Sequence, residues 1–269
     1  MKKILAIYYS QTGQLKKLLT NFLSGYKDKV TFSEIKTSQY GFPLTWNSMF
    51  EMFPESVLQI PCKISYNIPI DNYDTIIIGF QTWFLHLSLP ILTFSQTNDF
   101  LSAVKGKNVY LFMDCRNSWR TPMKLMKEKV NNAGGYVIGE YVYGSISGNF
   151  IGSISILHWF FTGVKKMLFF SEPGVPENEI KMAMHYGNKY LGIENRNKVM
   201  RFPIGKNKFL PIKTEKYASS KFEKWAKYIV KNDCRHRKLR LIYFKIWLIS
   251  IQIIISPILY VYRIICKFK

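Results

Sequence analysis

The sequence predicts an α/β domain built on a doubly wound, five-stranded parallel sheet, with a separate apolar segment at its C-terminal end. Five short runs of β-branched and other apolar residues recur along the chain, and segments with helical spacing separate them. This alternation is typical of a parallel sheet that carries helices on both faces. The 269 residues exceed what one such domain needs, so we also expect insertions or an appended segment.

The apolar runs and the helical spacings give the bounds of the expected elements. The predicted strands are Lys3–Tyr9, Val30–Ile35, Thr75–Phe80, Asn108–Met113 and Tyr136–Tyr143. The predicted helices are Gln14–Tyr26, Leu89–Val104, Thr121–Ala133 and Glu177–Leu191. Paired glycines at 134–135 end the third helix, and a Pro-Gly-Val-Pro turn precedes the fourth. Ligand-binding loops are expected at the carboxyl ends of the strands.

Two segments are longer than this scaffold requires. Residues 37–72 are rich in aromatic side chains, and residues 144–171 are apolar. Loops of this length usually carry function or structure of their own, so we predict walls or a lid over a ligand, or a membrane-contacting surface. Gly144, Gly148 and Gly152 recur every fourth residue, which suits close helix packing, but a turn-rich loop fits them equally. The predicted divisions are a domain at 1–195 with these insertions, a basic linker or extension at 196–240, and an apolar segment at 241–269.

The chain is strongly basic, with 38 Lys and Arg residues against 17 acidic residues. Between Arg196 and Arg240 there are 15 basic and 3 acidic residues. Such a segment indicates an anionic partner, either lipid headgroups or nucleic acid, or a solvated surface. We expect no nucleic acid, because the region has no recognisable binding motif and an apolar tail follows it directly.

The apolar tail predicts membrane association. Ile246–Tyr262 carries no charge over 17 residues. A bilayer span needs roughly 20 apolar residues, so the tail could just cross if Leu241–Phe244 is included, or it could lie in the interface, and Pro257 would kink it. A buried terminal helix is the alternative. Cations before the segment outnumber those after it, which places the domain at the cytoplasmic face of the membrane.

Neither the cysteines nor the N-terminus suggests an exported or metal-binding protein. Cys62, Cys115, Cys234 and Cys266 lie far apart and show no paired spacing, so we expect no zinc site, no other metal site and no disulfide framework. The first residues contain too short an apolar run for a secretory signal and fit a strand.

The sharpest local signal is Ser10-Gln11-Thr12-Gly13-Gln14, which ends the first strand and opens a helix. Hydroxyl groups and successive backbone amides at a helix N-terminus can bind a phosphate, and glycine permits a close approach. An ordinary polar turn with an N-cap is the alternative. Since neither a GxxxxGK nor a GxGxxG motif is present there, the pattern favours the phosphate of FMN bound without lysine or magnesium.

The loops after two further strands supply candidates for binding the flavin ring. The third strand runs into Gln81, Thr82, Trp83, Phe84 and His86. An aromatic side chain can flank a flat ring, and loop amides can reach ring oxygens and nitrogens, although both aromatics also fit ordinary packing. His86 is a candidate for moving a proton, but a lone histidine beside apolar residues is more often structural.

The loop after the fourth strand contains the second group of candidates. Arg116 can stabilise negative charge on a reduced flavin or an enolate, and Asn117 can orient a ring edge. Cys115 and Trp119 are expected beside the ring, without a nucleophilic role for the thiol. A solvated surface turn is the alternative. The second insertion contains the segment His158 to Lys166. Its aromatic side chains suit an apolar substrate, and its lysines suit a lipid headgroup or a nicotinamide phosphate. Alternatively, the aromatic side chains belong to the core and the lysines to a basic surface.

Together these loops resemble the flavodoxin-like family, whose phosphate loop has the form Ser/Thr-x-Thr-Gly-x-Thr. Ser10, Thr12 and Gly13 match this form, whereas Leu15 stands where the family has its last threonine. The resemblance covers Lys3 to Leu191 and implies a flavodoxin-like fold that binds FMN.

A narrower resemblance involves YYSQTGQL, FPESVLQIPC, CRNSW and WFFTGVKK. These segments are similar to flavodoxin-like proteins described as dialkylresorcinol-condensing enzymes or NAD(P)H-dependent oxidoreductases of bacterial aryl-lipid pathways. Asp114 and Ser118 depart from that pattern. The resemblance implies a flavin-dependent aromatisation of an alkylated cyclohexanedione, with NAD(P)H or a quinone as redox partner and an apolar aromatic or alkyl substrate.

Two classes of function remain open at this point. The first is a membrane-associated FMN oxidoreductase. The second is a flavin-free scaffold that holds partner enzymes at the membrane, which the leucine at position 15 favours. A one-electron carrier is disfavoured because such carriers normally dock through an acidic face. The sequence also leaves open whether the chain forms a homodimer.

Overall fold

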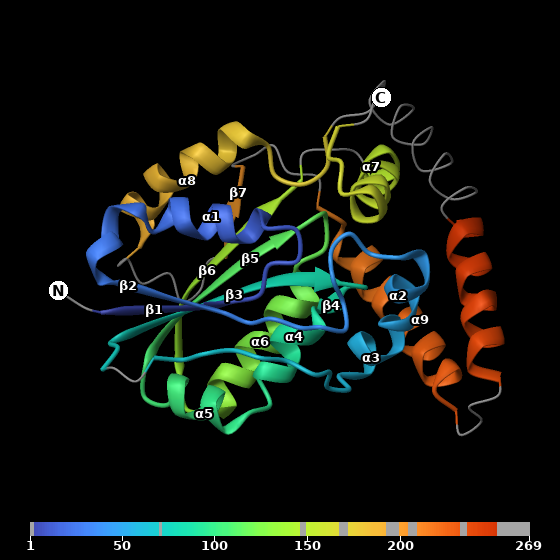
Figure 1. The fold of residues 1–269 in the computed structure, drawn as a ribbon, viewed down its shortest axis with the longest axis horizontal. Coiled ribbons are helices and arrows are strands. Elements are labelled where there is room, and N and C mark those ends of the chain that lie inside the picture. Colours follow the sequence, from blue (N-terminus) through green and yellow to red (C-terminus); the bar gives the residue numbers. More distant parts are fainter. Residues whose placement is uncertain are drawn as a thin grey trace.

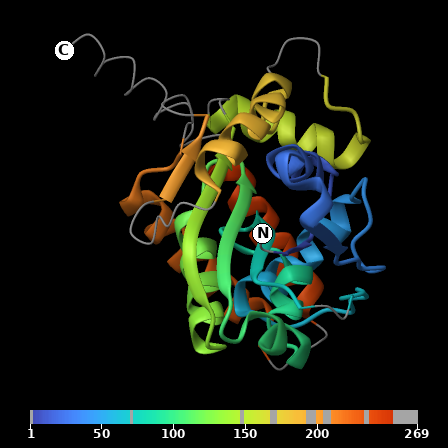
Figure 2. The ribbon, with the colours of Figure 1, turned by 90° about the vertical axis from the view of Figure 1, so that its left-hand side faces the viewer.

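The chain folds around a twisted β-sheet whose faces are both covered by helices (Figures 1 and 2). The computed structural model describes residues 3–69, 72–145, 149–166, 172–191, 199–203, 209–231 and 236–251. Within these ranges, six parallel strands lie in the order β2-β1-β3-β5-β6-β7. Their bounds are β1 Ile4–Tyr8, β2 Val30–Glu34, β3 Thr75–Trp83, β5 Asn108–Cys115, β6 Tyr136–Gly144 and β7 Val199–Phe202. The two-residue strand β4 (His86–Leu87) pairs antiparallel with the end of β3.

Each central strand sends alternate side chains into two different cores. In β1, Leu5 and Ile7 pack on one face of the sheet, while Ile4, Ala6 and Tyr8 pack on the other. Successive residues of a strand point to opposite faces, so a strand that is covered on both sides reads as a continuous apolar run. This is why the pattern in the sequence predicts these strands correctly.

Helices from separate parts of the chain cover the two faces (Figure 1). One face carries α1 (Gln14–Phe22), which the short 3-10 helix η1 (Ser24–Lys29) follows, and α8 (Glu177–Tyr190). The other face carries α4 (Leu89–Phe94), α5 (Asn98–Val104) and α6 (Arg120–Asn132). The predicted helix Leu89–Val104 is therefore two helices, since the chain leaves the helical path at residues 95–97 and Thr97 caps α5 by accepting a hydrogen bond from the Phe100 amide.

The prediction of five strands is wrong. All five predicted strands are present, and β7 extends the parallel sheet beyond β6, while β4 is added at the end of β3. Strand β7 is a four-residue segment within the basic stretch, where the local pattern is weak. It is stabilised by long-range packing, because Phe202 is fully buried and its ring stacks on Tyr143 with 4.9 Å between centroids.

The first insertion and the C-terminal extension meet beyond the carboxyl ends of the strands (Figure 1). The insertion contains α2 (Trp46–Glu51) and α3 (Phe53–Leu58), and the extension contains α9 (Ile212–Ile229) and a helix over residues 237–251. These four helices share a third apolar cluster, in which Phe53 and Phe244 stack with 3.8 Å between ring centroids. The segment 196–240, predicted as a basic linker or extension, includes β7 and α9, which both pack on the domain.

The second insertion contains a helix rather than a turn-rich loop. Helix α7 spans Asn149–Thr162 and lies beyond the same edge of the sheet as α2 (Figure 1). The Leu44 amide donates to the carbonyl of Phe160 at 2.7 Å, and the rings of Trp46 and Phe161 lie 5.1 Å apart. The two insertions therefore pack against each other.

No helix in the described ranges has both the length and the apolar character that crossing a bilayer would require. The predicted apolar segment 241–269 is described only as far as residue 251. Pro257 and the rest of that segment lie outside the described residues.

Substituting Ala for Gly187 tests how closely α8 approaches α1. A Cβ at this position would overlap the backbone carbonyl of Phe22. The helices would have to separate, so we expect the free energy of unfolding to fall by about 1–3 kcal/mol in urea denaturation. Gly41→Ala is the control, because a Cβ there meets nothing within 4 Å, and it should change stability by less than about 0.5 kcal/mol. Equal unfolding midpoints for the two variants would contradict this packing.

Candidate functional site

The candidate site lies where the loops after β1, β3 and β5 meet. The sheet has its topological switch between β1 and β3, because β2 flanks β1 on one side and β3 flanks it on the other. Open α/β sheets bind ligands in the crevice outside the strand ends at such a switch. The loop that joins β1 to α1 stands at this position.

The loop after β1 reaches α1 at Gly13, whose φ of 78° lies in the left-handed region. Glycine adopts this conformation without strain, and a Cβ here would meet nothing within 4 Å, so the backbone faces open space. Ser10 Oγ accepts a hydrogen bond from the Lys16 amide at 3.2 Å. Thr12 Oγ1 lies 3.5 Å from the Gln14 nitrogen. Both predicted hydroxyl groups therefore lie at the N-terminus of α1.

Among the backbone amides of this loop and the first turn of α1, those of Thr12, Gly13 and Leu15 donate to no group within the described part of the chain. They lie at the N-terminus of a nine-residue helix whose first turn contains no acidic side chain. Unpaired amides at the positive end of a helix favour an anion. Leucine has no hydroxyl group, and the Leu15 side chain is fully buried, so this position offers a ligand only its backbone amide.

One buried carboxylate holds both ends of the loop. The Gln11 amide donates to Gln81 Oε1 at 2.8 Å, and Gln81 Nε2 donates to Asp114 Oδ1 at 2.9 Å. Gln14 Nε2 donates to Asp114 Oδ2 at 3.0 Å, and Gln14 Oε1 accepts the Val175 amide at 3.1 Å. The loop is fixed at Gln11 and Gln14 in this way, and the unpaired amides lie between these residues and directly after them.

The Asp114 carboxyl is 5% exposed. Burial raises its pKa above the ordinary value, while the hydrogen bonds from Gln81 and Gln14 and the positive charge of Lys165 act in the opposite direction. Lys165 follows α7, and its Nζ lies 5.5 Å from the ring centroid of Trp159. The second insertion therefore contributes to the electrostatics of the site.

Five buried side-chain donors within the described part of the chain have no hydrogen-bond partner, and three of them follow β1 and β5. These three are Gln11 Nε2, Ser118 Oγ and Trp119 Nε1, and the other two are Ser88 Oγ and Tyr143 Oη. A buried donor without a partner costs roughly 1–3 kcal/mol, so such groups are rare unless a bound molecule satisfies them. The donors of Gln11, Ser118 and Trp119 belong to loops that meet at the candidate site.

The hairpin between β3 and β4 uses its aromatic side chains for packing. Trp83 is 6% exposed, and its ring lies edge-on to Tyr9 at 5.7 Å and to Tyr40 at 5.9 Å. Phe84 packs on Phe53 at 5.1 Å. Phe84 and Leu85 have φ values of 49° and 66°, which strain the backbone of bulky residues. Of the predicted ring-binding residues in this segment, Gln81 joins the hydrogen-bond network and Trp83 and Phe84 join aromatic clusters.

His86 is buried in β4, where it pairs with Trp83 across the hairpin. Its Nδ1 lies 3.0 Å from the Phe84 carbonyl oxygen, and burial lowers its pKa below the ordinary value. The ring is therefore neutral at physiological pH. Its contacts support the strained hairpin, and its predicted role in proton transfer remains a prediction.

The loop after β5 is held mainly through its backbone. The Arg116 carbonyl accepts the Ser145 amide at 3.1 Å, and the Asn117 carbonyl accepts the Leu210 amide at 2.7 Å. Cys115 is buried, and burial raises the pKa of its thiol well above the ordinary value, so the thiol is protonated. Arg116 is partly exposed and Asn117 is buried.

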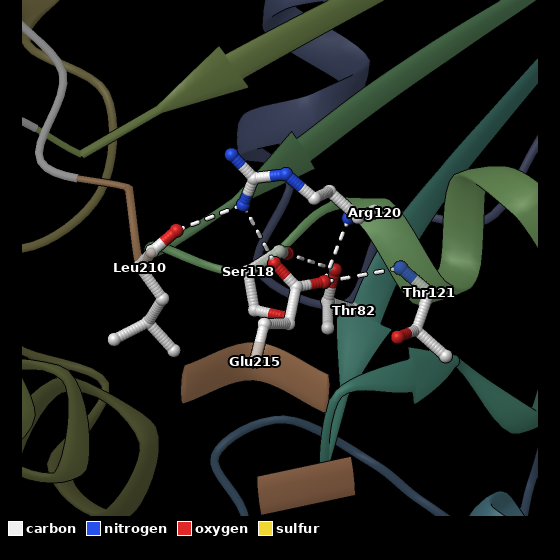
Figure 3. Close-up of polar contacts among 6 residues, drawn as sticks. All are labelled: Thr82, Ser118, Arg120, Thr121, Leu210 and Glu215. Carbon is white, nitrogen blue, oxygen red and sulfur yellow. Dashed lines mark hydrogen bonds and ion pairs between the residues drawn. The ribbon is translucent and has the colours of Figure 1, made fainter. Parts of the chain in front are cut away.

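Glu215 of α9 fixes the end of this loop from outside the predicted domain (Figure 3). Its Oε1 accepts the backbone amides of Arg120 and Thr121 at 2.8 and 3.0 Å, and its Oε2 lies 3.1 Å from Arg120 Nη1. The Arg120 guanidinium also donates to the Leu210 carbonyl at 2.8 Å. A carboxylate here caps α6 and interacts favourably with the helix dipole. Thr82 Oγ1 holds the other side of the loop through the Ser118 carbonyl at 3.0 Å.

Asp114 and Glu215 are the two important residues that the sequence reasoning missed as site residues. A polar residue near the end of the otherwise apolar strand β5 is a signal for Asp114. No local signal identifies Glu215, because it acts on residues 94 and 95 positions away.

The strand order and the parallel direction define a flavodoxin-like doubly wound fold. Numbered by chain order without the short strand β4, the first five strands β2-β1-β3-β5-β6 lie in the order 2-1-3-4-5 that is typical of this fold. Neither a known family model nor a curated protein matches the chain.

Several solved structures are similar to this chain. One is a flavoprotein in complex with FMN from Lactobacillus acidophilus NCFM, with 28% identity and a TM-score of 0.41 over 54% of this chain and 93% of that one. A WrbA-like flavodoxin from Agrobacterium tumefaciens has 12% identity and a TM-score of 0.38 over 70% and 94% of the two chains. Flavodoxin 1 from Bacillus cereus has 14% identity and a TM-score of 0.38 over 70% and 95%.

Replacing Glu215 by Gln tests the cap on α6. The amide keeps the shape of the side chain but removes the charge that pairs with Arg120, so we expect a loss of about 2–4 kcal/mol in the free energy of unfolding. Glu223→Gln in the same helix is the control, because its side chain is 52% exposed and forms an ion pair with Lys227 one turn away on the helix surface. That variant should change stability by less than about 0.5 kcal/mol. Similar losses in both variants would contradict the role of the cap.

The raised pKa of Asp114 predicts a specific pH dependence of stability. The native state holds the Asp114 carboxyl proton more tightly than the unfolded chain, so protonation of this group stabilises the fold. That contribution to the free energy of unfolding is fully present below the ordinary pKa of 3.8 and is lost as pH rises through the raised native pKa. Asp114→Asn should lack this decline in urea midpoints measured from pH 4 upward. Asp28→Asn is the control, because Asp28 is exposed, and this variant should keep the decline of the urea midpoint with rising pH. An unchanged pH profile in Asp114→Asn would show that the carboxyl does not titrate as described.

Proposed function

We propose that this protein binds FMN at the carboxyl ends of β1, β3 and β5 and acts as a flavin-dependent oxidoreductase. The observation that carries the proposal is the set of unpaired amides of Thr12, Gly13 and Leu15 at the topological switch point. A doubly wound sheet with this strand order binds a mononucleotide phosphate at such a position. No lysine or metal is required, because the amides and the helix dipole supply the positive potential.

The remaining donors fit the rest of such a ligand. Gln11 Nε2, Ser118 Oγ and Trp119 Nε1 are buried without partners, and acceptor oxygens of a ribityl chain or a flavin ring would satisfy them. Arg116, in the same loop as Ser118, is the candidate for stabilising negative charge on a reduced ring. Asp114 contributes by holding the phosphate loop in shape through the two glutamines.

Bound FMN supplies hydride and electron transfer, and the protein supplies position and electrostatics. For the substrate we propose an apolar aromatic or alkyl ring compound, such as an alkylated cyclohexanedione that loses two electrons and two protons to become a resorcinol. NAD(P)+ or a quinone would accept the electrons. The aromatic side chains that the two insertions bring together support an apolar substrate, since the ring of Phe42 lies 6.2 Å from that of Trp159 and the ring of Trp46 lies 5.1 Å from that of Phe161. Helices α2 and α7, which belong to these insertions, lie beyond the strand ends (Figure 1).

A flavin-free scaffold is the second candidate function. Three backbone amides here are already paired with side chains, because Lys16 donates to Ser10 Oγ, Gln14 to Thr12 Oγ1 and Gln11 to Gln81 Oε1. Leu15 removes the hydroxyl that the family pattern has at this position. A protein that remains colourless after incubation with FMN and reduces no quinone with NAD(P)H would favour this candidate.

Gln11→Leu separates flavin binding from folding. Removal of an unpaired buried amide group should leave the stability of the apoprotein unchanged or higher, since no hydrogen bond of the Gln11 side chain is lost. The same change should weaken FMN binding by about fivefold to tenfold in a visible absorbance or flavin fluorescence titration, because one donor to the ligand disappears.

Riboflavin, which lacks the phosphate, is the matched ligand control. We expect the wild-type chain to bind it at least about a hundredfold more weakly than FMN, because the amides at the phosphate loop then have no anion to bind. Equal affinity for the two flavins would place the ligand elsewhere, and absence of binding to either flavin would overturn the proposed function.

A further inference from the structure

The helix over residues 237–251 packs on the domain through one of its faces. Leu241 and Phe244 are buried, and the Phe244 ring stacks on Phe53 of α3. Trp247 lies 5.5 Å from Trp225 of α9, measured between ring centroids. This face completes the third apolar cluster of the protein.

Polar contacts fix the same face at two points. Arg237 Nη2 lies 2.6 Å from Glu55 Oε1 and 3.2 Å from the carbonyl oxygen of Glu51. Lys245 Nζ lies 3.3 Å from Asn47 Oδ1 and 5.2 Å from the ring centroid of Phe50. The helix is thus tied to α2 and α3 between residues 237 and 245, and its axis follows the surface of the domain (Figure 1).

The opposite face is apolar and exposed. Leu239, Ile242, Ile246 and Ile249 are 43%, 48%, 57% and 42% exposed. Their spacing of three, four and three residues places them in one stripe along the helix. A contiguous apolar stripe on a soluble surface marks an interaction site.

The surroundings of this stripe are basic. The described parts of α9 and of the terminal helix, residues 209–231 and 236–251, contain ten Lys and Arg residues and two acidic residues. Lys238 is exposed beside the stripe, and Arg240 lies over the ring of Tyr228 at 5.3 Å. Lys224 and Lys227 of α9 are exposed, and so is Lys231, which follows that helix and whose carbonyl accepts a hydrogen bond from Arg240 Nη1 at 3.1 Å. An apolar stripe flanked by cations is the pattern of a helix that lies in the plane of an anionic membrane surface.

We propose that the face formed by Leu239, Ile242, Ile246 and Ile249 binds an anionic lipid bilayer, with the helix parallel to the membrane plane. Insertion of residues 237–251 across the bilayer would require breaking the Arg237–Glu55 pair and the Phe53–Phe244 stack, whereas binding in the plane keeps both. The chain continues from this helix for 18 further residues, among which apolar side chains predominate. A second copy of the chain is disfavoured as occupant, because two such faces would bring like charges together.

The proposal is independent of flavin binding, and a vesicle experiment tests it directly. The full-length protein is mixed with vesicles of phosphatidylcholine containing about 30% phosphatidylserine, and the bound fraction is measured by co-sedimentation as a function of lipid concentration. We expect binding that weakens in high salt and in vesicles of phosphatidylcholine alone. The triple variant Ile242→Gln, Ile246→Gln and Ile249→Gln should bind at least about tenfold more weakly, since three half-exposed apolar side chains no longer enter the lipid.

Leu101→Gln is the matched control, because Leu101 is 46% exposed on α5, away from this face, and the variant should bind vesicles like the wild type. Far-ultraviolet circular dichroism and FMN titration of all variants separate loss of folding or of flavin binding from loss of lipid binding. Wild-type affinity of the triple variant for anionic vesicles would overturn the proposal. Failure of the wild type to bind anionic vesicles would equally overturn the proposal. A molecular mass that is dimeric for the wild type and monomeric for the triple variant would then identify a second copy of the chain as the occupant of this face.

Discussion

The buried carboxylate of Asp114 is the constraint on which the candidate site depends. Each of its oxygens accepts one side-chain amide, and these amides belong to Gln81 and Gln14, which hold the two ends of the loop after β1. Because the loop is fixed at both ends, its backbone cannot rearrange to form internal hydrogen bonds, and the amides of Thr12 and Gly13 between these ends stay unpaired. Because the anion-binding capacity of the loop comes from backbone groups, the side chains that shape it matter as much as those in the phosphate motif itself.

The C-terminal extension belongs to the same structural unit as the site. Glu215 caps α6 and fixes the loop after β5, and the cluster around Phe53 and Phe244 fixes the hairpin after β3. Two of the three loops at the strand ends are therefore held by residues beyond position 209. The lipid-binding face proposed for the terminal helix would lie on the outer side of this support, so the membrane and the site would be linked through one apolar cluster.

Much of the fold could be predicted from the sequence, because strands covered on both faces leave continuous apolar runs and α1 begins at a recognisable loop. Strand β7 could not, since its four residues include Arg201 and owe their pairing to the packing of Phe202. The position of the loop Ser10 to Gln14 at the N-terminus of α1 was predictable from residue types and spacing, and its binding of a phosphate remains a prediction. The roles of Trp83, Phe84 and Glu215 were not, because they depend on partners that only the tertiary structure identifies, and the same residue types fit a ring-binding or a packing role.

The central claim is that backbone amides of the loop after β1 bind the phosphate of FMN. Amide proton–nitrogen correlation spectra of the labelled protein, recorded with and without FMN, test it most directly. We predict large downfield proton shifts for Thr12, Gly13 and Leu15, with much smaller changes for Gln11 and Lys16, whose amides are already paired, and no such shifts with riboflavin. If FMN leaves the Thr12, Gly13 and Leu15 resonances in place, or if riboflavin moves them equally, the account is contradicted.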